Sequence, residues 1–237
     1  MTLTASSGHL GEGLLRAQVH WHTQHGEEAG DKPTAAPTAF AIAISREAGA
    51  NGAAVAAKLG ERLGWPVYDR ELLRHIAEEM GLSARLLESV DEKRVNWLME
   101  YLQAFVTNEA FNTGAFLHNL SKVMLSLAAH GQCVIVGRGA AHFLPPETTL
   151  RVRLIAPLED RIAVMEKRAG LRHDEAAQRV QETDRNRANF ARDHFHKHLA
   201  DPTNYDLILN TSRFTVEECA EVIEQALRRL QARKPRS

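Results

Sequence analysis

The chain has 237 residues, of which 44% are hydrophobic and 25% are charged, the balance of an ordinary globular protein. This length is enough for one domain with a sizeable core and some appendages. Its 29 Lys and Arg residues nearly cancel its 30 Asp and Glu residues, so the overall charge gives no reason to expect a nucleic acid or a membrane surface as a partner.

The sequence also lacks the usual marks of export and of membrane insertion. No apolar run approaches the about 20 residues that a membrane-spanning helix needs. The first residues, MTLTASSGHLGEGLLRAQ, contain no apolar stretch of a secretory signal. Cys133 and Cys219 lie far apart in apolar-rich segments and are expected to be buried thiols in a reducing compartment. These features predict a cytoplasmic protein.

Residues 1–38 differ in composition from the rest of the chain. They are rich in Gly, Ser, Thr, Ala and Pro and end in DKPTAAPTA, which predicts a mostly disordered leader. A regular alternation of apolar and polar segments begins at Ala39. We therefore expect one folded domain over residues 39–237.

Short apolar runs, each typical of a buried strand, alternate with helical patterns along this domain. Strands are predicted over residues 40–45, 65–69, 132–136, 150–155 and 205–209. Helices are predicted over residues 50–63, 70–80, 83–90, 95–130, 173–192 and 215–232, with one more beginning at Pro157. The alternation predicts an α/β fold with a five-stranded parallel sheet between two layers of helices, and residues 83–130 form a helical insert.

In such sheets, ligands bind beyond the carboxyl ends of the strands. In this chain the segments at those ends are SREAGANG, YDRE, GRG, APLEDR and NTS, all rich in polar or glycine residues. The first of them runs from a strand through Gly49 and Gly52 into a helix that begins near Asn51. Glycine lets main-chain N–H groups approach a ligand closely, and the helix N-terminus attracts anions. The corner suits a phosphate, although a plain packing turn explains the same glycines.

Several motifs in order resemble one family. These are ISREAGANGAAVAAKLGERLGWPVYDRELL, VIVGRGA, LRVRLIAPLEDRI, DRNRA and DPTNYDLILNTSRFTVEE, which together span most of the chain after residue 39. They resemble the cytidylate kinase-like family, a divergent branch of the P-loop nucleoside monophosphate kinases. The resemblance implies a P-loop kinase-like domain that uses ATP and Mg²⁺ and a nucleoside monophosphate. It also implies a lid region over residues 173–200, and it places the insert 83–130 on the acceptor side.

The resemblance implies a phosphate loop built from Ser45, Arg46, Gly49, Ala50, Asn51 and Gly52. Counting back from Trp65, Gly52 stands where an ordinary Walker A loop has its lysine, and Ala54 stands where it has the Ser or Thr that holds Mg²⁺. The loop is therefore a degenerate Walker A loop. Arg46 is the candidate replacement cation, because a guanidinium can hold two phosphate oxygens. The alternative for Arg46 is an ion pair with Glu47 or Asp69.

For the acceptor, the GRG segment is similar to the GRD segment of cytidylate kinases and implies that Arg138 binds the monophosphate. Gly139 replaces the aspartate of that segment. Asp69 is a candidate acceptor ligand or Mg²⁺ ligand, and equally a helix cap.

DRNRA matches the lid of cytidylate kinases. The resemblance implies that Asp184 and Arg187 bind the acceptor, and that Arg187 also contacts the transferring phosphates together with Arg185. A charged helix face is the alternative. Asn210 and Thr211 are implied to lie beside the adenine of ATP, and a helix N-terminal turn capped by Ser212 or Thr215 explains them equally well.

The expected function is ATP-dependent phosphoryl transfer to a nucleoside monophosphate, CMP or dCMP first. Two alternatives stay open at this point: a non-catalytic nucleotide-binding regulator on the same fold, and a kinase of another small metabolite. The sequence identifies no metal-binding side chain other than Asp69 as a candidate. It leaves the oligomeric state undetermined, with a homo-oligomer among the options.

Overall fold

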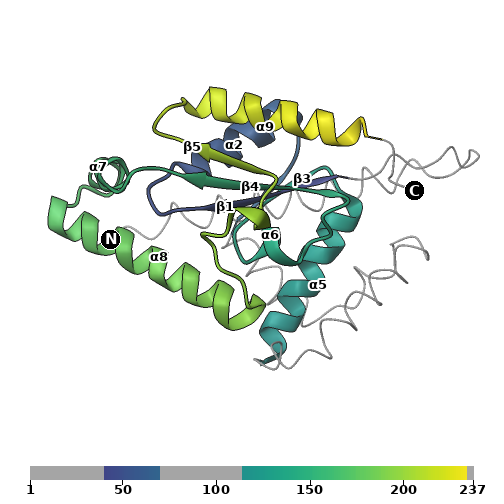
Figure 1. The fold of residues 1–237 in the computed structure, drawn as a ribbon, viewed down its shortest axis with the longest axis horizontal. Helices are drawn as coiled ribbons and strands as arrows, with labels where there is room; N and C mark the ends of the chain where they lie inside the picture. Colours follow the sequence, from purple (N-terminus) through teal and green to yellow (C-terminus); the bar gives the residue numbers. More distant parts are fainter. Residues whose placement is uncertain (1–39, 70–113, 234–237) are drawn as a thin grey trace, which may run out of the picture.

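The computed structural model describes residues 40–69 and 114–233. They form a five-stranded sheet with the strand order β2-β3-β1-β4-β5, in which all pairs are parallel (Figure 1). The strands are β1 (Ala41–Arg46), β2 (Val67–Tyr68), β3 (Cys133–Val136), β4 (Thr149–Ile155) and β5 (Leu207–Asn210).

The central strand β1 shows why the sheet needs cover on both faces. Its first four side chains are all buried, and they alternate between the two faces because the strand repeat is two residues. Ile42 and Ile44 pack in the cluster with α2 (Gly52–Leu63) and α9 (Val216–Gln231). Ala41 and Ala43 pack in the cluster on the opposite face.

Helices α2 and α9 lie together on one face of the sheet (Figure 1). Helix α2 ends at Gly64, which adopts the left-handed conformation, φ 67°, that glycine tolerates best. Helix α9 begins with a capping box, in which Thr215 Oγ1 accepts from the Glu218 N–H and a Glu218 carboxylate oxygen accepts from the Thr215 N–H.

The other face is covered by α5 (Gly114–His130), by the short helix α6 (Ala140–Phe143) and by the end of α8 (His173–Phe195). Phe143 of α6 is buried, and its ring stacks on that of Phe195 with the centroids 5.6 Å apart. These layers make the predicted three-layer α/β/α arrangement.

Helix α7 (Leu158–Ala169) is followed by α8; α7 and the start of α8 stand at the carboxyl end of the sheet, and α8 then runs back along the sheet (Figure 1). A small apolar cluster joins the two helices to Ala48, which follows β1: Ile162 comes from α7, and Ala176 and Val180 come from α8. The loop after the central strand is therefore packed directly against this helical pair.

The predicted fold class is confirmed, and so are the five strands in their order along the chain. Three details differ from the prediction. The second strand shrinks to two residues, α8 continues three residues beyond the predicted end at residue 192, and the short helices α6 and η3 (Pro202–Asn204) were not predicted. The leader 1–38, the helices predicted over 70–80 and 83–90, and the insert before Gly114 lie outside the described residues. Within the described ranges, no helix is both long enough and apolar enough to cross a bilayer.

Candidate active site

Two cavities lie on either side of the SREAGANG loop (residues 45–52), at the sheet edge that the sequence predicts. The α8 cavity has a volume of about 330 Å³ and is lined by Ser45 and Arg46, by residues 137–142 and by residues of α8. The α7 cavity has a volume of about 240 Å³ and is lined by Gly49, Asn51, Ala156, Asp160, Val164, Thr211 and Ser212. The same loop thus contributes its beginning to one cavity and its end to the other.

The second half of the loop has the backbone geometry of an anion-binding turn. Gly49 and Asn51 adopt positive φ angles of 81° and 50°, and α2 begins immediately after them at Gly52. The Asn51 side chain makes no capping hydrogen bond with the helix. The N–H groups in the first turn of α2 have no intrahelical partner, so they can donate to an anion in front of the helix.

The side chain of Arg46 takes the space that a Walker A lysine would start from. A Cβ atom added to Gly52 would lie 2.6 Å from Cγ of Arg46, and a Cβ atom added to Gly137 would overlap its Nη1 atom. The arginine therefore runs across the start of α2 and reaches the GRG segment with its guanidinium. Glycine is needed at position 52 because the stem of the arginine packs directly on its Cα atom, and it is favoured at position 137 because the backbone there has a φ of 83°.

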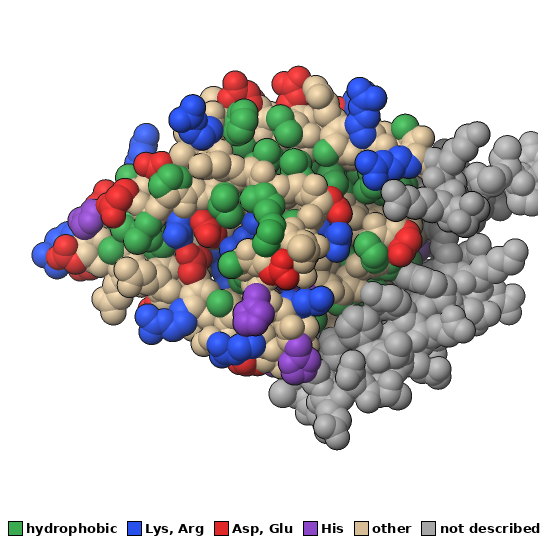
Figure 2. Space-filling view, viewed as in Figure 1, with side chains coloured by type: hydrophobic (Ala, Val, Ile, Leu, Met, Phe, Trp, Pro, Cys, Tyr) green, Lys and Arg blue, Asp and Glu red, His purple; other side chains and the backbone are tan. Residues whose placement is uncertain are grey.

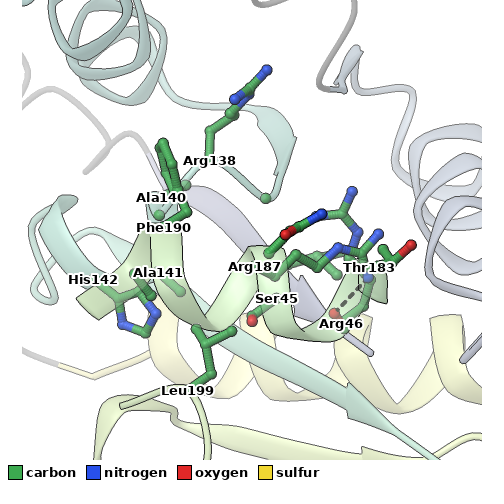
Figure 3. A pocket seen from close by; sticks show the side chains of 15 residues that line it. Ser45, Arg46, Arg138, Ala140, Ala141, His142, Thr183, Arg187, Phe190 and Leu199 are labelled. Atoms are coloured by element: carbon green, nitrogen blue, oxygen red, sulfur yellow. Dashed lines mark hydrogen bonds between the residues drawn. The ribbon is translucent and has the colours of Figure 1, made fainter. Parts of the chain in front are cut away.

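Arg187 of α8 lies beside Arg46. Its Nη1 atom donates to the main-chain oxygen of Arg46 at 3.0 Å, and Figure 3 shows the two side chains next to each other. Both residues line the α8 cavity. The side chain of Ser45 is fixed by a hydrogen bond, in which its Oγ accepts from Nη1 of the buried Arg153 at 2.8 Å. The structure thus brings Ser45, Arg46 and Arg187 together at the α8 cavity.

Arg138 also lines the α8 cavity, but in Figure 3 its side chain points away from Arg46 and Arg187. Its guanidinium carbon lies 5.8 Å from the centre of the Phe190 ring, a cation–π contact. Beside it, Gly139 has a φ of 77°, and the ring of Phe195 occupies the space of a Cβ atom there. The position that carries aspartate in ordinary cytidylate kinases is therefore closed by an aromatic ring.

His142 lines the same cavity from α6. Burial, and next the nearby charges of Lys197, Arg153 and Arg151, lower the pKa of its imidazole to about 4. The ring is therefore neutral at physiological pH, and its aromatic neighbour Tyr205 lies 5.8 Å away between centroids.

The three predicted site residues of the DRNRA motif, Asp184, Arg185 and Arg187, lie in different surroundings in the structure. Asp184 turns toward the SREAGANG loop, where its carboxylate accepts from the Ala48 N–H at 2.7 Å and pairs with Arg161. Arg185 is exposed on α8 and lines neither cavity. Of these three residues, Arg187 lines the α8 cavity.

In the α7 cavity, Thr211 is anchored by its N–H and its hydroxyl, which both donate to the Ile155 oxygen, at 2.9 and 3.3 Å. Asn210 accepts from the Ser212 N–H at 3.0 Å and so shapes the turn, but it does not line the cavity. Of the two predicted alternatives for the cap of the following helix, Thr215 is confirmed.

Two further predicted site residues lie at the margins. Ala50 is buried in the SREAGANG loop, where its N–H donates to the Glu47 oxygen at 3.3 Å. Asp69 is exposed directly after β2, whose Tyr68 pairs with Ile135 of β3, so it lies at the same edge as the GRG segment.

Sequence reasoning missed Arg153, Arg161 and His142. The sequence carries one signal for Arg153: it lies inside the apolar run LRVRLI, and an arginine there needs a polar partner once the strand is buried. The APLEDR segment was noted as a strand end, but no residue in it was singled out.

Residues 41–213 match the model of the cytidylate kinase-like family. The chain belongs to this family. It is 26% identical to a cytidylate kinase of Methanopyrus kandleri over 196 residues, which covers 78% of this chain and 92% of that protein. It is 25% identical to a cytidylate kinase of Pyrococcus horikoshii over 192 residues, 78% of this chain and 87% of that protein.

Among solved structures, an uncharacterized protein from Eubacterium ventriosum shares the fold. It superposes with a TM-score of 0.64 at 20% identity, over 80% of this chain and 98% of that one. Family membership and the two cytidylate kinase relatives together support nucleotide kinase activity for this chain.

Proposed function

We propose that this member of the cytidylate kinase-like family transfers the γ-phosphoryl group of ATP to a nucleoside monophosphate, with CMP or dCMP as the first candidates. The observation that carries the proposal is the position of Arg46. Its stem packs on Gly52, which follows Asn51 of the α7 cavity, and its guanidinium lies against Gly137 in the α8 cavity.

In this proposal the α7 cavity takes ATP. The turn at Gly49 and Asn51 and the first turn of α2 bind the phosphates through main-chain N–H groups, and Thr211 lies beside the adenine. The α8 cavity takes the acceptor phosphate, with Arg187 and Arg138 as its cations and Phe190 as an apolar wall.

Phosphoryl transfer depends mainly on positioning and on neutralising negative charge, so it requires no protein nucleophile. Arg46 supplies this charge in place of the lysine of a Walker A loop. Its two terminal nitrogens can bind oxygens of both the transferred group and its neighbours. Helix α8 acts as the lid of the site and carries Arg187 against the loop.

Mg²⁺ would shield the ATP phosphates when it is bound with the nucleotide. Ala54 offers no hydroxyl to such an ion, but hard carboxylate oxygens are present at this edge on Asp69 and on Asp160, which lines the α7 cavity. Asp160 fits Mg²⁺ that enters with ATP in the α7 cavity, and Asp69, which follows the edge strand β2, is the candidate on the acceptor side. A cytoplasmic location is proposed with it, because both cysteines, Cys133 and Cys219, are free buried thiols and form no disulfide.

A coupled assay tests the proposal. ADP formation is followed with ATP, Mg²⁺ and a panel of CMP, dCMP, UMP, AMP and GMP, for the wild type and for Arg46→Ala and Arg187→Ala. Arg192→Ala is the matched control, since Arg192 is an exposed arginine of the same helix whose side-chain partners among the described residues are its neighbours Asp193 and Asn189.

Turnover with one monophosphate, lost in both test variants and kept in the control, supports the proposed kinase. ATP binding without turnover on any acceptor would instead favour a regulatory nucleotide-binding protein. Turnover that appears only with other phosphorylated metabolites or alcohols would make it a kinase of another small molecule.

A further inference from the structure

The SREAGANG loop is held at its centre by an ion pair that comes from the two helices α7 and α8. The Ala48 N–H donates to Asp184 Oδ1 at 2.7 Å, and the Ala48 oxygen accepts from Arg161 Nη1 at 3.3 Å. Arg161 and Asp184 also pair with each other. Both peptide groups of one loop residue are therefore bound by two side chains that are bound to each other.

Other contacts fix the arginine in this position. Its Nε donates to the Ala156 oxygen at 2.9 Å and lies 3.4 Å from a carboxylate oxygen of Glu47. The same Glu47 oxygen accepts from the Ala156 N–H at 3.1 Å. Gly49 has no room for a side chain because its missing Cβ atom would overlap the backbone of Arg161. The loop thus packs closely against Arg161 and is hydrogen-bonded to it.

The energetics of burial make the pair interdependent. Arg161 is only 9% exposed, so it depends on its carboxylate partners to offset the loss of water. When one partner of a buried pair is removed, the other remains as an uncompensated charge and its surroundings rearrange. The surroundings here are the peptide planes on either side of Ala48, which set the direction of the N–H groups that follow.

We propose that Arg161 and Asp184 are a positioning pair that holds the SREAGANG loop in its anion-binding shape and ties that shape to helix α8. Asp184 acts through the loop and not as a ligand of the acceptor. Neither side chain is among the described residues that line the two cavities. The inference rests on the proposed function only in that the ligand of the loop is the phosphate chain of ATP.

The structure offers a matched control for this pair. Glu166 of α7 and His173 of α8 form a second contact between the same two helices, 3.0 Å long, at exposed positions away from the loop. Glu166→Gln therefore perturbs the packing of α7 on α8 without touching Ala48. Asp184→Asn and Arg161→Lys are the test variants, since each keeps part of the hydrogen bonding and changes the charge or its geometry.

Dissociation constants of ATP and of CMP are measured separately by calorimetry, without turnover. The expected result is a rise of roughly 10-fold or more in the ATP constant for both test variants, the size of one charge-assisted hydrogen bond. The CMP constant should stay within about twofold, and Glu166→Gln should leave both unchanged. A rise in the CMP constant alone in Asp184→Asn would overturn the inference, as would unchanged constants for both ligands.

Coupling between the two residues gives a second criterion. In the double variant Arg161→Lys with Asp184→Asn, the rise in the ATP constant should be clearly smaller than the product of the two single rises, because the residues act as one unit. A rise equal to that product would mean that they act independently, and the pair would not exist as proposed.

A readout that needs no nucleotide separates this inference from the proposed function. In a sample labelled with ¹⁵N-alanine, the amide proton of Ala48 should move upfield in Asp184→Asn and stay in place in Glu166→Gln, since the bond to a carboxylate is the stronger one. If wild type binds no ATP but this shift occurs, the kinase proposal fails and the positioning pair stands. If Ala48 does not respond, the pair does not hold the loop.

Discussion

Gly52→Ala is the substitution that probes the placement of Arg46 most sharply. The added methyl carbon would lie 2.6 Å from Cγ and 2.9 Å from Cβ of Arg46, well inside the about 3.5–4.0 Å at which carbon atoms pack. Both atoms belong to the part of the arginine near its backbone. The arginine cannot relieve the clash by moving only its tip, so the whole side chain must leave the start of α2.

The effect on stability and the effect on activity should differ. Overpacking costs about 1–3 kcal/mol, and alanine in place of glycine returns up to about 1 kcal/mol of helix propensity, so the net loss of stability is about 0–2 kcal/mol. Losing one charge-assisted contact to phosphate costs about 1.5–3 kcal/mol, which lowers kcat/KM about 10- to 100-fold. Activity should therefore fall in a protein that remains folded.

The assay pairs urea unfolding with steady-state kinetics on the same preparations. Ala57→Ser is the control, because residue 57 is exposed on α2 beyond its phosphate-binding first turn and its change adds one atom in solvent. If Gly52→Ala kept wild-type kcat/KM, Arg46 would not be needed where the structure places it, and the reasoning would be refuted.

Three further predictions follow from single side chains. The pKa of His142 is about 4 in the folded protein and 6.5 in the unfolded chain, so the wild type loses about 1–3 kcal/mol of unfolding free energy as the pH falls between these values. His142→Phe should remove this loss, which urea unfolding at pH 7 and pH 4.5 would detect. Glu224→Gln should cost about 1–2 kcal/mol in urea unfolding, because the buried carboxylate of α9 holds Arg62 of α2 at 2.8 Å; an unchanged midpoint would contradict this. Gly139→Asp should destabilise the protein by about 2 kcal/mol or more, since Phe195 fills the space of its Cβ. A gain of CMP affinity with an unchanged melting temperature would contradict this, because it would show that the Phe195 ring moves aside without cost.

The parts of the structure that could be predicted are those that depend on local sequence pattern. The run AIAIS reads as a strand buried on both faces, and the stripe Val55, Leu59 and Leu63 reads as one helix face. Thr215 followed by Glu218 carries the sequence pattern of a capping box. Because parallel strands end at one edge, the loops at those ends could also be expected to meet.

Contacts between distant segments could not be predicted from such patterns. Asp184 reaches a main-chain N–H that lies 136 residues earlier in the chain, and Arg161 reaches an oxygen 113 residues earlier. A charged residue on a helix looks the same in the sequence whether it faces solvent or a loop. The sequence showed that Gly139 replaces an aspartate, but the ring of Phe195 that fills the space comes from another helix.

The most direct test of the account is chemical rescue of Arg46→Ala. The central claim is that the guanidinium of Arg46 does the work of the lysine that the loop lacks. With ATP, Mg²⁺ and the preferred monophosphate, kcat should fall about 100-fold in Arg46→Ala and recover in part when millimolar guanidinium is added. Arg192→Ala should keep the wild-type kcat, and guanidinium should not change it. An Arg46→Ala variant with wild-type kcat, or a defect that guanidinium leaves unchanged while the protein remains folded, would contradict the claim.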